Sequence, residues 1–206
     1  MRASLNRAVE APAKSVERAV SRVSHEVRII GGQWKRTKLK VANKPGLRPT
    51  PDRVRETLFN WLGQDLSGWR CVDVFAGTGA LGFEAASRGA REVKLVESDK
   101  SLIAQLEAVK LQLTADKVQV IRGDGVGTLK GQGEHSIDLV FLDPPFDSHL
   151  FEPALQAASL AIAAAGFVYL EAPKKWPDEK LLVFRLTTHR YLKAGAVHAH
   201  LLKRAA

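Results

Sequence analysis

The stretch that most constrains the fold is CVDVFAGTGALG, residues 71–82, in which a short apolar run enters a glycine-rich turn. A helix-forming segment, LGFEAASRGA, follows the turn. A strand, a tight glycine turn and a helix in succession are typical of a nucleotide-type site at the carboxyl edge of a parallel sheet. The pattern alone fits dinucleotide sites, S-adenosylmethionine sites and strand-to-helix turns that bind no ligand.

The acidic residue inside this strand, Asp73, favours one of these ligands. It lies four residues before Gly77. A dinucleotide would place its pyrophosphate at the turn, where a carboxylate would repel it. S-adenosylmethionine has no phosphate and carries two cationic groups, an ammonium and a sulfonium. The alternative is that Asp73 only binds amides of the loop. The sequence therefore predicts a methyl-donor site.

Two further acids follow the next two strands. Glu97 ends the strand EVKLVE, residues 92–97, about 20 residues after the first glycine of the turn, where an acid commonly binds a ribose. Asp124 follows the strand VQVIR, residues 118–122. The carboxyl ends of parallel strands lie at one edge of a sheet, so we expect Asp73, Glu97 and Asp124 to converge on one ligand.

A fourth apolar strand, IDLVFL, residues 137–142, runs directly into Asp143-Pro144-Pro145-Phe146. The two prolines fix the backbone and remove two N–H donors, which leaves carbonyl groups to accept hydrogen bonds. An acid, free carbonyls and an aromatic ring form a pocket for a flat group that carries an NH2. The alternative is a rigid turn with a capping aspartate.

The net charge of +9 belongs entirely to the first 70 residues. They contain 15 Lys and Arg against 6 Asp and Glu, whereas the remaining residues contain 16 of each sign. A basic arm on a neutral domain indicates a polyanionic partner such as nucleic acid. The alternative is a solvated charged surface that aids solubility.

Part of this charge lies in VRIIGGQWKRTKLKV, residues 27–41, where we predict strand-like pieces around a hairpin or bend at Gly31-Gly32. A helix is predicted over residues 52–62, with Thr50 as its N-cap. Trp34 can stack on a base or pack against the domain, and the sequence leaves both open. The predicted RNA-binding residues are Arg28, Trp34, Lys35, Arg36, Lys38, Lys40, Arg53 and Arg55.

Other classes of site are absent from the sequence. A single cysteine excludes an internal disulfide and a cysteine-rich zinc site, and the six histidines show no metal-ligand spacing, so no metal is expected. No apolar run approaches the roughly 18 residues of a transmembrane helix, and no secretory signal is visible. We expect a cytoplasmic protein with no membrane partner, and a monomer because no coiled-coil pattern is present.

With both DVFAGTGALG and DPPF in view, the chain resembles the class I S-adenosylmethionine-dependent methyltransferases. The DPPF tetrapeptide marks the branch that methylates exocyclic amino groups of bases. More narrowly, the chain is similar to the RsmD-type guanine-N2 methyltransferases of bacterial 16S ribosomal RNA. The stretches that carry this likeness are VRIIGGQWKRTKLKV, GLRPTPDRVRETLFNWL, DVFAGTGALGFEAASRGA, LVE and FLDPPF. One departure is LEAVKLQL, where the family often has an asparagine.

The resemblance implies an α/β Rossmann-like fold: a seven-stranded sheet, six strands parallel and one antiparallel, with helices on both faces. We expect three parts: a disordered or frayed extension (1–26), a basic hairpin or arm (27–49) and the methyltransferase domain (50–206). After the fourth strand we expect a helix and three strands, the last two an antiparallel edge hairpin, at residues 149–161, 166–171, 182–188 and 196–202.

The resemblance also implies roles for single residues. Asp73 and the turn would hold the methionine end of the donor, Glu97 the ribose hydroxyls and Asp124 the adenine amino group. The expected donor-binding residues are Arg48, Thr50, Asp73, Phe75, Ala76, Gly77, Thr78, Gly79, Glu97, Ser98, Asp124 and Gly125. The expected catalytic residues are Asp143, Pro144, Pro145 and Phe146.

The implied activity is methyl transfer from S-adenosylmethionine to the N2 amine of a guanine in 16S ribosomal RNA, either naked or within an assembled small subunit. DPPF also permits a DNA adenine or cytosine amino-methyltransferase, although no extra target-recognition domain is evident in 206 residues. A third possibility is a non-catalytic RNA-binding assembly factor with the same fold. That reading predicts damaged motifs, whereas both motifs are complete.

Overall fold

A computed structural model describes residues 26–40 and 50–205 of the chain. Its helices are α1 (Asp52–Leu62), α2 (Ala80–Ser87), α3 (Lys100–Leu113), α4 (Gly125–Lys130), α5 (Phe151–Ala161) and α6 (Asp178–Leu182). Its strands are β1 (Glu26–Arg28), β2 (Lys38–Lys40), β3 (Arg70–Asp73), β4 (Glu92–Glu97), β5 (Val118–Arg122), β6 (Ile137–Leu142), β7 (Ile162–Ala172), β8 (Leu186–Ala194) and β9 (Val197–Arg204). The predicted disordered or frayed extension, residues 1–26, lies outside the described residues except for Glu26, which belongs to β1.

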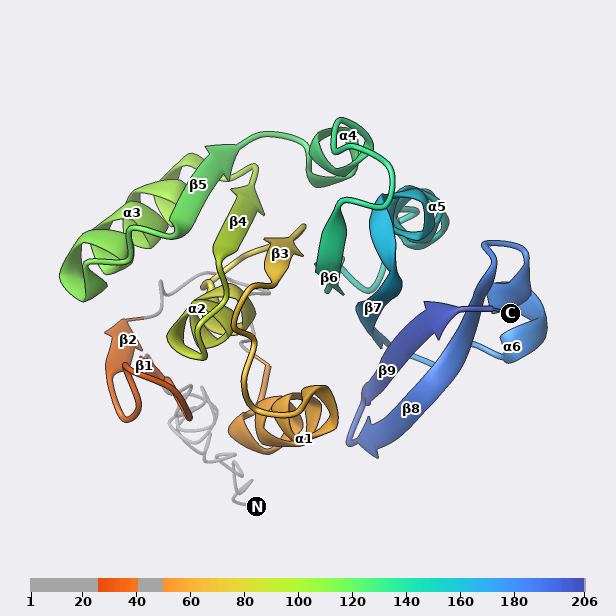
Figure 1. The fold of residues 1–206 in the computed structure, drawn as a ribbon, viewed down its shortest axis with the longest axis horizontal. Coiled ribbons are helices and arrows are strands. Elements are labelled where there is room, and N and C mark those ends of the chain that lie inside the picture. Colours follow the sequence, from red (N-terminus) through yellow and green to blue (C-terminus); the bar gives the residue numbers. More distant parts are fainter. Residues whose placement is uncertain (1–25, 41–49, 206) are drawn as a thin grey trace, which may run out of the picture.

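The main sheet has seven strands in the order β5-β4-β3-β6-β7-β9-β8 (Figure 1). The pairs from β5 to β7 are parallel, and β9 is antiparallel to both β7 and β8. Strand β8 therefore runs in the same direction as the parallel strands, which leaves β9 as the reversed strand. This confirms the expected sheet of six strands in one direction and one in the other, and the edge hairpin.

Helices cover both faces of this sheet. Side chains of α1, α2 and α3 share one hydrophobic core with the sheet, and those of α4, α5 and α6 share a second. Alternate residues of β6 serve the two cores, with Phe141 in the first and Val140 and Leu142 in the second. Burial on both faces explains why this strand reads as a continuous apolar run.

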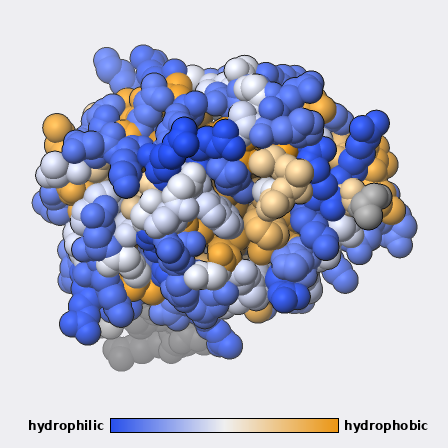
Figure 2. Space-filling model, viewed as in Figure 1, coloured by the Kyte–Doolittle hydropathy of each residue, from blue (hydrophilic) through white to orange (hydrophobic). Residues whose placement is uncertain are grey.

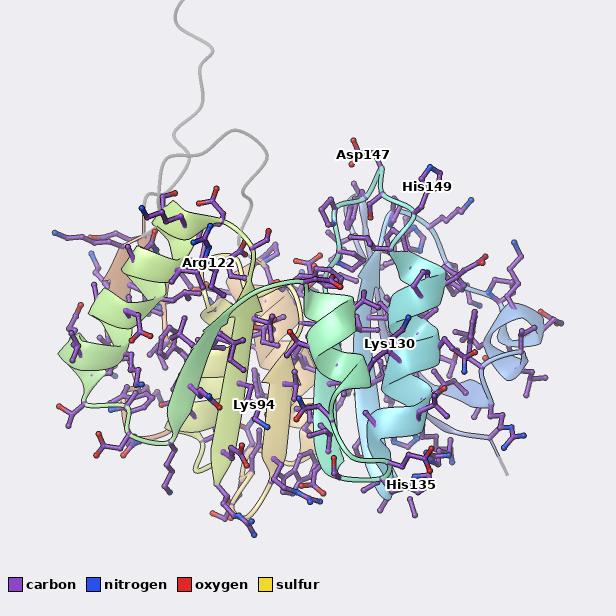
Figure 3. All side chains as sticks on the ribbon, turned by 90° about the horizontal axis from the view of Figure 1, so that it is seen from above. Lys94, Arg122, Lys130, His135, Asp147 and His149 are labelled. Carbon is purple, nitrogen blue, oxygen red and sulfur yellow. The ribbon has the colours of Figure 1, made fainter. Side chains whose placement is uncertain are left out.

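The order of the sheet reverses at β3, since β4 and β6 lie on either side of it. A ligand crevice forms at such a reversal, outside the carboxyl ends of the strands. Figure 3 shows this edge: Arg122 at the end of β5 and Asp147 beyond β6 lie at one edge of the sheet, and His135, which precedes β6, lies at the other. The candidate motifs therefore all project toward one edge.

The N-terminal hairpin is present as predicted. Strands β1 and β2 are antiparallel, with Val27 opposite Leu39. Both of these side chains are buried, whereas the remaining residues of the two strands are exposed. Figure 1 shows the hairpin beside α2 and α1, away from the edge formed by β8. Its apolar residues thus attach it to the domain and its cations face outward.

Two local predictions differ from the structure. A strand was expected from residue 182, but Asp178–Leu182 forms α6 and the strand starts at Leu186. The helix follows Pro177 and carries two acids in its first turn, where the helix dipole favours them. Helix α4 was not predicted. It begins at Gly125 because the Asp124 carboxylate accepts two amide N–H groups of its first turn.

The surface is predominantly polar. Figure 2 shows hydrophilic residues over most of one face, with hydrophobic residues in smaller groups between them. Within residues 26–40 and 50–205, no helix has the length and apolar character needed to cross a bilayer.

Candidate active site

The glycine turn after β3 is held by a buried carboxylate. Asp73 is 2% exposed, and its Oδ2 accepts the N–H of Gly82 at 3.2 Å. Burial raises the pKa of Asp73 to about 7, against the effect of this bond, and the charges of Glu97 and Glu171 raise it further. The hydrogen bond from Gly82 agrees with the amide-binding alternative for Asp73, and its role toward a cationic ligand stays a prediction. A carboxylate that buried and that close to other acids is stabilised by a cationic ligand.

Glycine is required at the start of α2. Gly79 has φ +77°, and a Cβ there would lie 2.7 Å from the side chains of Leu106 and Phe83. Larger residues would push the turn away from the helix, so this position keeps the backbone close to the sheet.

Glu97 and Asp124 also lie at the carboxyl edge, where each fixes a loop. Glu97 Oε2 accepts the N–H of Gly77 at 3.0 Å, which joins the end of β4 to the glycine turn. Gly125, next to Asp124, packs so closely on β3 that a Cβ would lie 2.1 Å from the Val74 carbonyl oxygen. The loops after β3, β4 and β5 are therefore joined at one edge of the sheet. That Asp73, Glu97 and Asp124 converge on one ligand stays a prediction.

The DPPF loop follows β6 on the other side of β3. Asp143 is half-buried, Pro144 is buried, Pro145 is exposed and Phe146 is 40% exposed. Burial raises the pKa of Asp143 well above its usual value, and the charges of Glu171 and then Asp73 add to the increase. An exposed ring beside a carboxylate of raised pKa suits a flat base that enters from solvent.

A residue that sequence reasoning missed is Glu171, near the end of β7. It is 3% exposed, and its Oε1 accepts the Thr50 hydroxyl at 2.7 Å and the Tyr169 hydroxyl at 2.8 Å. Burial raises the pKa of Glu171, against the two hydrogen bonds and the charge of Arg55. Its position was a usable signal, because an acid near the carboxyl end of a parallel strand had already marked the other candidates.

The hydroxyl of Thr50 has a different role from the one expected. We predicted that it would cap α1, but Pro51 precedes the helix and no side chain caps it. The Thr50 hydroxyl donates to Glu171 instead, so the segment that enters α1 is tied to the end of β7. Arg48, expected to close over the donor with Thr50, lies outside the described residues.

Register places three acids on one face of the sheet. Asp73 pairs with Phe141, and Phe141 pairs with Tyr169, so these three side chains point to the same face. Asp143 and Glu171 each lie two residues farther along their chains, which returns them to that face. Carboxylates from β3, β6 and β7 therefore gather under α1 at the carboxyl edge. We call Asp73, Asp143 and Glu171 the acid cluster.

Most of the predicted RNA-binding cations are exposed. They are Arg28, Lys35, Arg36, Lys38, Lys40 and Arg53. Two of them form surface ion pairs, Arg28 with Asp52 at 3.0 Å and Lys38 with Glu26 at 2.8 Å. Trp34 is half-buried and packs against the core, which favours the second of its two roles, attachment of the hairpin to the domain.

Arg55 corrects a prediction. It was expected to grip phosphate, but it is fully buried and its Nη1 lies 3.4 Å from Oε2 of the equally buried Glu84. Its Nη2 donates to the Arg28 carbonyl at 2.9 Å and to Asp52 at 2.6 Å. A cation in the first half of a helix opposes the helix dipole, and here the buried acid accounts for it.

A metal ion has no evident place. Within the part of the chain that the structure describes, no group of three or more His, Cys, Asp or Glu side chains is arranged to hold one.

The sheet order, the glycine turn after β3 and the acids at the strand ends together define a Rossmann-like class I methyltransferase. Within that class, the chain belongs to the family described as Conserved hypothetical protein 95, whose model matches residues 27–203.

Named relatives agree with this assignment. A protein of Haemophilus influenzae called Ribosomal RNA small subunit methyltransferase D is 43% identical over 74% of this chain and 81% of its own length. The protein of that name from Escherichia coli K12 is 40% identical over 89% of this chain and 92% of its own. The solved structure of the Escherichia coli methyltransferase yhhF has a TM-score of 0.74 and 38% identity, over 88% of this chain and 99% of that chain.

Proposed function

We propose that the chain transfers a methyl group from S-adenosylmethionine to the exocyclic N2 amine of a guanine in 16S ribosomal RNA. Relatives 40% and 43% identical to it are named Ribosomal RNA small subunit methyltransferase D, which supports ribosomal RNA as the substrate. The observation that carries the proposal is the placement of Asp73 and Asp143 on one face at one edge of the sheet. Asp73, which would pair with the cationic methyl donor, thus lies beside the DPPF loop, which would bind the amino group of a base.

The residues around the glycine turn fit the methyl donor, which supplies an electrophilic methyl group on a sulfonium sulfur. Asp73 offers a buried carboxylate to the ammonium group of the donor. Gly79 lets the backbone of the turn pack closely against the side chains of Leu106 and Phe83. Glu97 would bind the ribose hydroxyls and Asp124 the adenine amino group. The remaining expected contacts to the donor are Arg48, Thr50, Phe75, Ala76, Gly77, Thr78, Ser98 and Gly125.

The residues of the DPPF loop fit the acceptor. The N2 amine of guanine is a poor nucleophile because its lone pair is conjugated with the ring. Asp143 and the Pro144 carbonyl can accept its two N–H groups, which turns the lone pair toward the methyl group. As the N–CH3 bond forms and the S–CH3 bond breaks, the amine releases one proton, for which Asp143 is the acceptor. Phe146 stacks on the base once it is splayed out of the RNA.

Glu171 would act on both parts of this site. It accepts the hydroxyl of Thr50, an expected donor-binding residue, and so fixes that residue in place. As the neighbour of Asp143 it raises the pKa of that carboxyl group, so that Asp143 becomes a stronger proton acceptor. Its proposed role is thus to position and tune the residues that contact the ligands.

The experiment is transfer of a labelled methyl group to 16S ribosomal RNA, followed by identification of the methylated nucleoside. We expect Asp143→Ala to lower the rate by about 100-fold or more, the usual size of a general acid–base contribution. The affinity for the donor, measured by calorimetry, should change little. The matched control is Asp147→Ala, since Asp147 is exposed in the same loop (Figure 3). Near-normal transfer by the Asp143 variant would contradict the assignment.

The same assay separates the remaining alternatives. Naked 16S ribosomal RNA, assembled small subunits and duplex DNA are compared as acceptors at equal target concentration. Methylation of DNA but not of RNA would favour an adenine or cytosine amino-methyltransferase. Absence of transfer to any acceptor would favour a non-catalytic RNA-binding factor. The proposal includes a monomer acting in the cytoplasm, where ribosomal RNA is found, and sedimentation of the purified chain tests the first of these.

A further inference from the structure

A cavity of about 440 Å³ lies between the turn of the N-terminal hairpin and the outer side of α1. Its polar lining comes from two cations, two residues of α1 and one residue just beyond the helix end: Lys35, Arg88, Glu56, Asn60 and Gln64. Among the residues that the structure describes, no predicted donor-binding or catalytic residue lines it. Asn60 lies eight residues beyond Asp52 on α1, which at about 1.5 Å of rise per residue is roughly 12 Å along the helix. The cavity is therefore separate from the active site.

The hairpin side of this cavity is fixed to α2. The N–H of Gly31 donates to Glu84 Oε1 at 2.8 Å, and the Ser87 hydroxyl donates to the Gly31 carbonyl at 2.6 Å. The N–H of Gln33 donates to the Ser87 carbonyl at 2.8 Å. Gly32 has φ +73°, and a Cβ there would lie 1.9 Å from the Ser87 carbonyl oxygen, so the turn lies directly on the helix end. The wall is thus formed before any ligand arrives.

The helix side presents an ordered set of hydrogen-bonding groups. Arg88 Nη1 donates to Gln64 Oε1, and Gln64 Nε2 donates to Asn60 Oδ1. Because arginine can only donate, this chain fixes the direction of both amides and leaves the Asn60 NH2 group as the donor at its end. Glu56 lies one turn earlier on the same side of α1, is exposed and has no ion-pair partner among the described residues.

We propose that this cavity binds one unpaired nucleotide of the RNA substrate, with its base edge on Glu56 and Asn60 and its phosphate on Lys35. The inference rests on the proposed function for its substrate class. Unpaired bases of RNA are recognised on their hydrogen-bonding edges, and phosphate contacts set their position. Lys35 lines the cavity and is exposed, on the basic hairpin.

The hydrogen-bond acceptor of Glu56 and the donor of Asn60 together determine which base the cavity prefers. A carboxylate accepts hydrogen bonds only, and it can accept two neighbouring N–H groups at once. Guanine offers N1–H and N2–H side by side, with the O6 acceptor next to them. Glu56 can accept the first two while the Asn60 NH2 group donates to O6. The cavity therefore prefers guanine over the other bases, as a second contact point away from the methylated nucleotide.

The first test is kinetic and uses the double variant Asn60→Ala/Gln64→Ala with a 16S ribosomal RNA fragment. We expect KM for the RNA to rise by about tenfold, the effect of losing one or two good base contacts, with kcat and the donor Kd unchanged. The matched control is Gln112→Ala, an exposed amide on α3 outside the cavity. A KM within twofold of the wild-type value would overturn the inference. Wild-type protein that methylates no RNA would instead defeat the proposed function.

The second test does not depend on activity. The side-chain amide signals of Asn60 and Gln64 are followed by nuclear magnetic resonance while GMP, AMP, CMP or UMP is added to the full chain. We expect GMP to shift both signals at a lower concentration than the others, and Glu56→Gln to remove that preference. Signals that stay unmoved by all four nucleotides, or that move equally with each, would overturn the inference even if the protein proves to be an RNA methyltransferase.

Discussion

Two groups of buried charge lie under α1 on the same face of the sheet, and they differ in balance. In the first, which we call the anchor cluster, Glu84 is fully buried between Arg55 at 3.4 Å and Arg88 at 2.9 Å. Glu84 also accepts the N–H groups of Ile30 and Gly31, each at 2.8 Å. Every charge in this group has an opposite partner, and together they attach the hairpin to α2.

The acid cluster has no such balance. Asp73, Asp143 and Glu171 are all acidic, and Arg55 is the only cation that influences the pKa of any of them in the described residues. Their pKa values are raised, because burial and mutual repulsion oppose the charged forms. A group of this kind is costly for the folded protein alone and becomes favourable when a cationic ligand binds. Buried charges that have partners of opposite sign therefore belong to the fold, whereas buried charges of one sign mark the candidate functional site.

The largest expected effect comes from breaking the balanced group. Glu84→Ala removes the acid that two buried guanidinium groups share and leaves Arg88 with no ion pair among the described residues, while Arg55 keeps Asp52 at 2.6 Å. We therefore expect the free energy of unfolding to fall by about 3–5 kcal/mol in urea denaturation. The amide protons of Ile30 and Gly31 should also lose protection from hydrogen exchange. The control is Glu107→Ala, a half-buried acid of α3, for which we expect a change of about 0.5 kcal/mol or less. A similar change in both variants would show that Glu84 is not the anchor.

The two groups also differ in how far sequence could predict them. The acids at the ends of β3, β4 and β5 were visible because each follows an apolar strand at a fixed place in the pattern. Glu171 also lies near the carboxyl end of a parallel strand, but it comes after residues 27–146, which contain the recognised motifs. The anchor cluster was not visible, since Arg55 and Glu84 lie 29 residues apart on two helices. The helical period does place Arg55 on the same face as Leu58 and Leu62, which was a usable sign that it faces inward. Its buried acid partner could not be read from the period, because that pairing depends on tertiary packing.

Local elements show the same limit. Strands β4, β5 and β6 have the predicted bounds, because apolar runs between polar loops define them. Helix α4 is six residues long and has too few residues to show a helical period. The cavity beside α1 was equally hidden, since its two walls come from the hairpin and from a helix whose outer side looked like ordinary solvated surface.

A second prediction concerns the acid cluster and the effect of Asp73→Asn on the pH dependence of stability. The folded-state pKa of Asp73, about 7, lies above its ordinary value of 3.8, so the native state holds a proton that the unfolded chain has lost. Stability without donor should therefore fall as pH rises from about 4 to 7, by at most about 4 kcal/mol from this group. The variant should show a smaller fall between pH 5 and pH 8 in urea denaturation. An unchanged pH dependence would show that Asp73 ionises normally.

The same variant tests the donor site. Loss of a buried charge opposite a cationic ligand should weaken donor binding by roughly 10- to 100-fold, as measured by calorimetry at pH 7.5. Wild-type protein should bind the donor more tightly as pH rises through about 7, because the ionised carboxylate is the form that pairs with a cation. Donor affinity that is independent of both pH and the substitution would place the ammonium group elsewhere.

The smallest expected effect comes from Glu171→Gln, which removes a charge and keeps the shape. A glutamine oxygen can still accept the hydroxyls of Thr50 and Tyr169, so the fold around it should persist. The pKa of Asp143 should fall, because the neighbouring negative charge that disfavoured its ionised form is gone. The acidic limb of the kcat profile should therefore move to lower pH, and the rate above the limb should fall modestly, because Asp143 becomes a weaker proton acceptor. A purely structural role for Glu171 would leave that limb in place, as we expect for the control Glu179→Gln on the exposed side of α6.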